Sequence, residues 1–196
     1  MIFILAGGRS SRMGKEKPVL KIAGKEMLLW VYDEISSIDE TVVALSKNTP
    51  KTKNLCLRER ITFVETPGRG YVEDIKWLLT EFGAFVSVSA DLPFVKACDV
   101  ALIRNELEKK KVSITGVLPI NVVPKDLRIT TYRGYAIVGI NGVSYEGEEF
   151  VELSNPLLAL NVNTPMELEL ANRIAKLLQP KFAKDVVDIK VFPHHI

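Results

Sequence analysis

Short apolar runs and amphipathic segments alternate along most of the chain. Apolar runs of the length that predicts buried strands occupy residues 2–6, 41–46, 61–65, 85–89 and 114–118. Between them, apolar residues at helical spacing predict helices over residues 27–35, 72–82 and 99–111. Strands that alternate with helices in this order are typical of a mostly parallel sheet covered on both faces. We therefore predict an α/β protein with a three-layer, Rossmann-like arrangement.

The pattern changes at Pro119, where the apolar runs become shorter. These runs are interrupted by Gly134, Gly139, Gly142 and Gly147. Such interruptions predict a small antiparallel region laid over the main sheet. Further on, Thr164, Pro165 and Glu167 have the spacing of a capping box with proline at the first helical position. The helix that they open is expected to bury Leu168, Ala171, Ile174 and Leu178.

A glycine-rich, basic loop follows the first predicted strand. It reads Leu5-Ala6-Gly7-Gly8-Arg9-Ser10-Ser11-Arg12-Met13-Gly14 and is followed by Lys15, Glu16, Lys17 and Pro18. Glycines let backbone N–H groups approach an anion closely, and the basic side chains supply positive charge. Five residues between Gly8 and Gly14 exclude the Walker A spacing, and the dinucleotide-binding pattern is absent as well. We interpret the loop as a triphosphate cradle of another kind.

Oxygen-bearing side chains after later apolar runs are candidate metal ligands. Asp91 follows the run 85–89, where a doubly wound sheet places its ligand crevice. A hard cation bound by one or two carboxylates and substrate phosphates needs few further protein ligands. Asn161 and Asn163 are spaced by two on a segment predicted to be a strand, so their side chains are expected to point the same way. They precede the N-terminus of a predicted helix, a favourable place for a phosphate.

Three further segments contain candidate binding residues, and each also has a purely structural interpretation. Ser46 and Asn48 follow the second predicted strand, although Thr49-Pro50 fits an ordinary helix start. The segment from Thr66 to Tyr71 contains two glycines that permit close backbone approach, although Pro-Gly-x-Gly also fits a turn. Gly139 interrupts a predicted strand, which indicates either a β-bulge or the close approach of another group.

The first loop, Leu-x-Gly-Gly-x-Ser-x-Arg-Met-Gly followed by Lys-Pro, resembles the signature loop of the MobA-like nucleotidyltransferases. Segments 48–53, 65–74, 139–141 and 161–164 resemble, in the same order, the archaeal adenosylcobinamide-phosphate guanylyltransferases of that superfamily. The resemblance covers nearly the whole chain. It implies the nucleotide-diphospho-sugar transferase type of α/β fold, Mg²⁺ as cofactor, and GTP and adenosylcobinamide phosphate as substrates.

The resemblance also implies roles for individual residues. The expected GTP-binding residues are Leu5, Ala6, Gly7, Gly8, Arg9, Arg12, Met13, Gly14, Lys17, Ser46, Asn48, Thr66, Gly68, Gly70, Tyr71 and Ser89. The expected catalytic residues are Gly8, Arg12, Lys17, Asp91 and Asn161. Gly139 and Asn141 are expected to border the acceptor, and Asp91 and Asn163 to bind the metal. The resemblance leaves open which of the two asparagines, Asn161 or Asn163, is the metal ligand.

Length and composition are sufficient for one sizeable core, and the small net charge argues against a broad nucleic-acid-binding surface. The chain has 196 residues, 47% of them apolar, and a formal net charge of +2. We expect one domain over residues 1–196, with a nucleotide-binding half (1–118), an acceptor-binding half (119–180) and a C-terminal tail (181–196). The two cysteines do not suggest a disulfide framework, and neither a secretion signal nor a membrane-spanning run is recognisable, so a cytoplasmic location is expected.

Histidine and cysteine catalysis is not expected. The two histidines are His194 and His195 near the end of the chain, and Cys56 and Cys98 are expected to pack against neighbours. A phosphate nucleophile needs no general base, because its second pKa lies near ~6. Nucleotidyl transfer can therefore rely on positioning and charge neutralisation. Two alternatives stay open, namely guanylyl transfer to molybdopterin and a GTP-binding module without catalytic activity.

Overall fold

The computed structural model describes residues 1–10, 12–127 and 129–178. Within these residues, eight strands form one sheet: β1 (Ile2–Leu5), β4 (Thr41–Leu45), β5 (Phe63–Glu65), β6 (Phe85–Ser89), β7 (Ser113–Pro119), β8 (Thr131–Tyr132), β9 (Tyr135–Val143) and β10 (Glu148–Glu152). The α-helices are α1 (Met27–Ile35), α2 (Pro50–Glu59), α3 (Tyr71–Phe82), α4 (Ala97–Lys110) and α5 (Pro165–Leu178). The strands and helices predicted before residue 119 are all present, with ends shifted by at most two residues.

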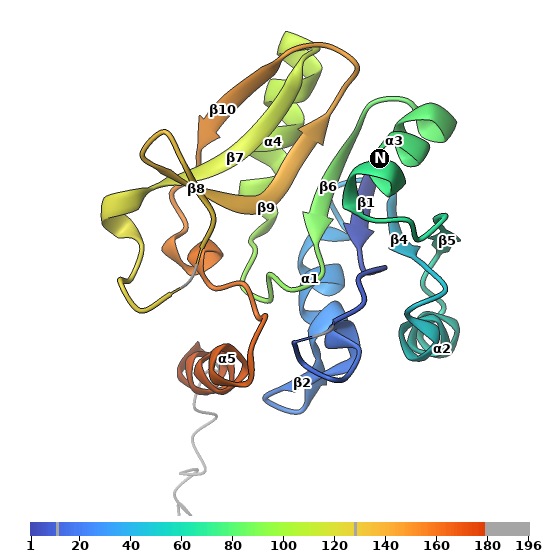
Figure 1. Ribbon diagram of the computed structural model, residues 1–196, viewed down its shortest axis with the longest axis vertical. Helices are drawn as coiled ribbons and strands as arrows, with labels where there is room; N and C mark the ends of the chain where they lie inside the picture. Colours follow the sequence, from blue (N-terminus) through green and yellow to red (C-terminus); the bar gives the residue numbers. More distant parts are fainter. Residues whose placement is uncertain (11, 128, 179–196) are drawn as a thin grey trace, which may run out of the picture.

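The order of the strands is β10-β7-β9-β6-β1-β4-β5, and β8 pairs with β9. β1 lies between β4 and β6 and pairs in parallel with both. The chain therefore runs outward from β1 to β4 and β5, then returns to β6 on the other side of β1. Such a reversal is the topological switch point at which doubly wound sheets bind ligands. The carboxyl ends of β1 and β6 point toward the end of the molecule that carries β2 and α5 (Figure 1).

Alternating side chains of the central strands bury both faces of the sheet. Ile2 and Ile4 of β1 belong to a large apolar cluster with residues of α1, α2 and α4. Phe3, between them, points to the opposite face and packs in a cluster with Leu78 and Leu79 of α3. Helices thus cover two faces of one sheet, which confirms the predicted three-layer α/β class.

The region after Pro119 differs from the prediction in one respect. β9 is not laid over the sheet but inserted in it, antiparallel to both β6 and β7. β10 pairs in parallel with β7 and forms the edge. The expected nucleotide-binding and acceptor-binding halves therefore share one continuous sheet. Local sequence patterns report the strands but not their partners, because pairing over many residues depends on the whole chain.

A second apolar cluster, which was not expected from the sequence, connects the segment after the signature loop with the last helix of the described chain. It joins a small hairpin, β2 (Lys21–Ile22) and β3 (Lys25–Glu26), to α1 and α5. Trp30 Nε1 donates a hydrogen bond to the Ile22 carbonyl at 2.9 Å, and Asn172 Oδ1 accepts one from the Ala23 N–H at 2.9 Å. This cluster holds the residues that follow the signature loop (residues 5–17) against α5.

The start of α5 is as predicted, but its buried face is shorter. The Thr164 hydroxyl accepts a hydrogen bond from the Glu167 N–H at 3.3 Å. The Glu167 carboxylate accepts from the Asn163 N–H at 2.7 Å rather than from Thr164, so the cap extends one residue further back. Leu178, expected to be buried, is 54% exposed because the second apolar cluster ends near Ala175.

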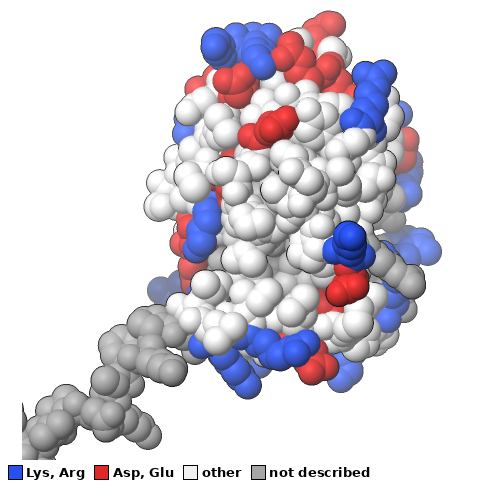
Figure 2. Space-filling model, turned by 90° about the vertical axis from the view of Figure 1, so that its left-hand side faces the viewer, with Lys and Arg blue, Asp and Glu red and all other residues white. Residues whose placement is uncertain are grey.

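The face that carries β8 and β10 is mostly uncharged, and Lys, Arg, Asp and Glu side chains lie mainly around its margin (Figure 2).

Cys56 is buried as expected, and burial raises the pKa of its thiol to about 11. Cys98 is exposed, so the expectation that it packs against neighbours is wrong. No helix among the described residues is long and apolar enough to span a membrane.

Candidate active site

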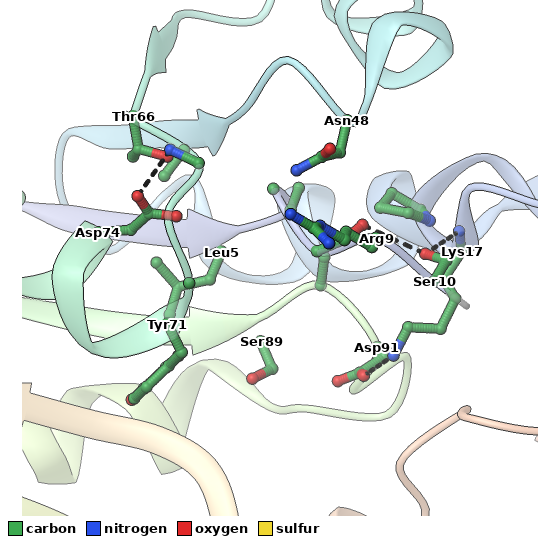
Figure 3. Close-up of a pocket in the computed structure, with 18 of the residues that line it drawn as sticks. Leu5, Arg9, Ser10, Lys17, Asn48, Thr66, Tyr71, Asp74, Ser89 and Asp91 are labelled. Atoms are coloured by element: carbon green, nitrogen blue, oxygen red, sulfur yellow. Dashed lines mark hydrogen bonds and ion pairs between the residues drawn. The ribbon is translucent and has the colours of Figure 1, made fainter. Parts of the chain in front are cut away.

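A cavity of about 560 Å³ lies at the switch point and is lined by the ends of β1 and β6 and by the loops after β4 and β5 (Figure 3). Expected site residues that line it are Leu5, Ala6, Gly7, Gly8, Arg9, Lys17, Asn48, Thr66, Gly68, Gly70, Tyr71, Ser89 and Asp91. The topology thus collects side chains from four separate segments at one edge of the sheet. The volume of the cavity falls in the usual range for small-molecule sites, about 300–1,000 Å³.

Ser46 does not line the cavity, and its buried side chain holds the residues that do. Its hydroxyl donates a hydrogen bond to the Gly7 carbonyl at 2.6 Å. The same oxygen accepts hydrogen bonds from the backbone N–H and the side-chain amide of Asn48, each at 3.1 Å. A Cβ at Gly7 would lie 3.2 Å from the Cβ of Ser46, so the loop runs against this support with little space to spare. Ser46 therefore acts behind the site, not at its surface.

The signature loop folds back on itself through Ser10 and Lys17. Ser10 has a positive φ of 49°, and its hydroxyl accepts a hydrogen bond from the Lys17 N–H at 3.0 Å. Lys17 begins a short 3₁₀ helix with proline at its second position, η1 (Lys17–Val19). The backbone of Lys17 is thus fixed by the loop that precedes it, and Figure 3 shows its side chain directed toward Asp91.

Lys17 joins the two segments that contain the expected metal ligands. Its ammonium group forms an ion pair with the Asp91 carboxylate and donates a hydrogen bond to Asn163 Oδ1 at 2.8 Å. The side chains of Lys17 and Asp91 are each only 18% exposed. The Val162 N–H donates to the Asp91 carbonyl at 3.0 Å, which holds the segment before α5 beside the end of β6. The contact between Lys17 and Asn163 joins residues that are 146 positions apart in the chain.

The convergence of Asp91 and Asn163 on a cation is the observation that bears on metal binding. A carboxylate and an amide oxygen are ligands that Mg²⁺ takes, so these two residues fit the expected cofactor. Asn161 Oδ1 is buried and has no hydrogen-bond partner among the described residues. Within the same residues no cluster of three or more His, Cys, Asp or Glu side chains could hold a metal, so phosphate and water oxygens would complete the coordination.

The segment with the two asparagines is not a strand, contrary to the prediction. Residues 161–163 belong to no strand, and the side chains of Asn161 and Asn163 have different surroundings. Asn163 contacts Lys17, whereas the Asn161 side-chain oxygen is buried. A spacing of two residues places side chains on one face only within a regular strand.

The loop after β5 is shaped by two glycines and by Asp74. Gly68 has a φ of +66° and Gly70 a φ of +123°, conformations that side-chain-bearing residues rarely adopt. A Cβ at Gly68 would also lie 3.0 Å from the Cβ of Ser46. Asp74 Oδ1 accepts hydrogen bonds from the Gly68 N–H at 2.8 Å and the Arg69 N–H at 3.4 Å. The first turn of α3 therefore holds this loop in place (Figure 3).

Asp74→Ala is expected to weaken binding of the expected nucleoside triphosphate about tenfold. The substitution leaves the two loop N–H groups without their charged acceptor, and such bonds contribute about 1.5–3 kcal/mol. Glu73→Ala is the matched control, because Glu73 is exposed and pairs with Lys76 at 3.6 Å, so less than a twofold change is expected. Titration calorimetry measures both dissociation constants. Equal effects of the two substitutions would contradict a role of Asp74 in shaping the loop.

Tyr71 is the first residue of α3 and lines the cavity between the Thr66 loop and β6. Desolvation raises the pKa of its hydroxyl, and contact with Ser87 partly opposes this shift. The phenol is therefore neutral at pH 7.

Gly139 and Asn141 lie on β9 and do not line the cavity. The pairing of β9 with β7 shifts register here, so that residues 138–140 lie opposite Gly116 alone. A Cβ at Gly139 would lie 2.7 Å from the Cβ of Ser89. The bulge and the close approach that the sequence offered as alternatives therefore both occur.

Several expected residues lie elsewhere, and some lining residues were missed. Arg12, Met13 and Gly14 of the signature loop do not line the cavity, and Arg12 is exposed. The lining residues that were not expected are Ser10, Pro18, Ala44, Arg69, Asp74, Ile75 and Ala90. An acidic residue in the first turn after a glycine loop is the signal that could have identified Asp74.

Similarity to known proteins agrees with this geometry. A family model described as the MobA-like NTP transferase domain matches residues 2–119. An adenosylcobinamide-phosphate guanylyltransferase of Methanocaldococcus jannaschii is 32% identical over 190 residues, covering 88% of this chain and 96% of the relative. A probable molybdenum cofactor guanylyltransferase of Natranaerobius thermophilus is 30% identical over 123 residues, covering 60% of this chain and 58% of the relative.

Solved structures share the fold at low sequence identity. Molybdopterin-guanine dinucleotide biosynthesis protein A from Archaeoglobus fulgidus has a TM-score of 0.67 at 20% identity, covering 90% of this chain and 99% of its own. A CMP:2-keto-3-deoxy-manno-octonic acid synthetase in complex with CTP has a TM-score of 0.68 at 17% identity. The match covers 91% of this chain and 99% of the synthetase chain. The architecture is therefore that of nucleotidyltransferases.

Proposed function

Because the chain belongs to the MobA-like NTP transferase family, we propose that it transfers GMP from GTP to adenosylcobinamide phosphate and releases pyrophosphate. Family membership makes the protein a nucleotidyltransferase that uses a nucleoside triphosphate, and it disfavours a binding module without catalytic activity. The choice of acceptor follows the relative that is similar over 88% of this chain.

The observation that carries the proposal is the arrangement of Lys17, Asp91 and Asn163 beside the glycine loop. One cationic and two oxygen-bearing side chains lie at the end of β6, next to the backbone of Gly7 and Gly8. A triphosphate needs cations and N–H donors on one side and a place for a metal ion on the other. This combination supports binding of a metal–nucleotide complex.

In the proposed reaction, an oxygen of the acceptor phosphate forms a bond with the α-phosphorus of GTP. The bond from that phosphorus to the bridging oxygen breaks, and pyrophosphate leaves with the bonding electrons. Arg9 and Lys17 would neutralise the triphosphate, and the Gly7 and Gly8 backbone would follow the phosphates closely. Asp91 and Asn163 would hold Mg²⁺, which when bound neutralises charge on phosphoryl oxygens. No side chain has to remove a proton from a phosphate nucleophile.

Guanylyl transfer to a molybdenum cofactor precursor is the second candidate. It is favoured by the Natranaerobius relative and by the Archaeoglobus structure. The former matches only 60% of this chain, whereas the corrinoid relative extends through the region after β7. We expect that region to choose the acceptor, and therefore rank the corrinoid first.

An acceptor comparison separates the candidates. Protein, Mg²⁺ and GTP are incubated with adenosylcobinamide phosphate, with molybdopterin or with unphosphorylated adenosylcobinamide, and released pyrophosphate is measured. We expect release with adenosylcobinamide phosphate alone, since the unphosphorylated control lacks the nucleophile. Release with molybdopterin alone would favour the second candidate, and release with neither acceptor despite GTP binding would contradict both. CTP in place of GTP tests the choice of base.

A further inference from the structure

Glu16 lies immediately before Lys17 and connects the signature loop to α2. Its carboxylate accepts hydrogen bonds from the Lys51 N–H at 3.0 Å and from the Thr52 N–H at 2.8 Å. The Thr52 hydroxyl donates a third, also at 2.8 Å. Thr52 is fully buried, and its two bonds to Glu16 are partly buried, whereas the bond from the Lys51 N–H is exposed. One side chain of the loop thus binds the whole first turn of a helix that begins 34 residues later.

Glu16 replaces a cap that α2 does not supply for itself. The residue before the helix, Thr49, makes no side-chain bond to the helical N–H groups. Its hydroxyl donates to the Ser46 carbonyl at 3.1 Å and accepts from the Ser46 N–H at 3.3 Å. The first N–H groups of a helix require partners, and a carboxylate there is favoured by the helix dipole as well. Because the free N–H groups at the N-terminus of α2 bind Glu16, this helix end holds the signature loop and does not bind a phosphate itself.

The signature loop is therefore attached to the β4–α2 connection at both ends. At its beginning, the Gly7 carbonyl accepts the hydrogen bond of Ser46. At its end, Glu16 binds the first turn of α2, and the next residue, Lys17, reaches Asp91 and Asn163. Glu16 itself does not line the cavity. Its contacts define the position of the Lys17 backbone without requiring contact with substrate.

We propose that Glu16 is a positioning residue for nucleotidyl transfer, which anchors the loop on α2 so that Lys17 is directed to the triphosphate and to Asp91. The inference rests on the role proposed above for Lys17. A lysine whose backbone is not held can still reach a phosphate, but it loses part of the binding advantage that a fixed orientation provides. Loss of Glu16 should therefore act only where Lys17 is present.

A double-substitution cycle tests this dependence. GTP binding in the presence of Mg²⁺ is measured by calorimetry for the unaltered chain, Glu16→Ala, Lys17→Met and the double variant. We expect each single substitution to weaken binding about tenfold, and the double variant to bind no more than about twofold weaker than Lys17→Met alone. If the two losses multiply in the double variant, Glu16 acts independently of Lys17 and the inference is overturned. GTP binding needs no acceptor, so this result does not depend on which acceptor the enzyme uses.

Matched isosteric substitutions separate positioning from stability. Asp99 lies in the first turn of α4 and outside the cavity lining, and its carboxylate accepts hydrogen bonds from the N–H of Lys96, the residue before the helix, at 2.9 Å and from Asn155 Nδ2 at 2.8 Å. Glu16→Gln and Asp99→Asn both remove a helix-capping charge, and thermal unfolding measures the loss of stability in each. We expect a lower kcat for Glu16→Gln than for the unaltered chain, but higher than for Glu16→Ala because the amide oxygen still accepts, and an unchanged kcat for Asp99→Asn. An equal fall of kcat in both variants would overturn the inference.

Discussion

Replacing Asp91 with asparagine should lower the rate of pyrophosphate release by two to three orders of magnitude at fixed Mg²⁺. The side chain keeps its shape but loses the charge that pairs with Lys17 and that a divalent cation requires. Loss of one preorganised electrostatic interaction typically costs about 10²–10³ in rate. The rate is measured as a function of Mg²⁺ concentration, and part of the loss should be recovered at higher concentration if the carboxylate binds the metal.

The fold of this variant should be unaffected. The Asp91 carbonyl accepts its hydrogen bond from Val162 through the backbone, which the substitution does not change. Asp33→Asn is the control, because Asp33 forms an exposed ion pair with Lys25 and its loss should have no effect on turnover. A rate within twofold of the unaltered chain for Asp91→Asn would remove Asp91 from the metal site and from the proposed mechanism.

Replacing Gly139 with alanine should destabilise the protein by about 1–3 kcal/mol, the usual result of overpacking. The added Cβ would lie 2.7 Å from the Cβ of Ser89 and 3.2 Å from Leu92 Cδ1, and a Cβ fixed by a strand cannot move without its backbone. Ser89 lines the cavity in which we propose that GTP binds, so weaker GTP binding should accompany the loss of stability. Urea unfolding measures the free energy, and calorimetry measures the binding.

Removing the Cβ of Ser89 tests whether its contact with the added Cβ causes the loss of stability in Gly139→Ala. In a Ser89→Gly background, Gly139→Ala should cost less than about 1 kcal/mol, because the close contacts of the added Cβ with Oγ and Cβ of Ser89 both disappear. Gly8→Ala is the control for stability, since a Cβ there would meet no atom within 4 Å. An equal cost of Gly139→Ala with and without Ser89 would show that the collision is not the reason for the glycine.

The site residues that could be predicted from the sequence lie in segments that directly follow a strand. The signature loop, Asp91 and the Thr66–Tyr71 segment each follow a strand of parallel type, and all parallel strands end at the same edge of a sheet. Knowing only the strands is then sufficient to place these residues together. The bond from the Glu167 N–H to the Thr164 hydroxyl at the start of α5 belongs to the same class, because an N-terminal cap involves neighbouring residues alone.

The residues that were misplaced depend on contacts over long distances in the chain. Asn161 and Asn163 were expected to share a face, but the segment pairs with no strand and is held by Asp91 and α5 instead. β9 was expected above the sheet, yet it lies between β6 and β7. The first error concerns the element itself, because residues 161–163 are not a strand, and the second concerns only the partners of a correctly predicted strand. A periodic pattern does not say what a segment contacts.

The sequence alone determined the α/β class, because strand and helix periodicity are local properties, and its resemblance to the MobA-like nucleotidyltransferases indicated the class of enzyme. Only the tertiary structure decided that Lys17 lies between Asp91 and Asn163, that Glu16 caps a helix 34 residues away, and that Gly139 is packed against Ser89. These relations follow from the order of the strands and from dense packing of the interior, and no single segment encodes either property.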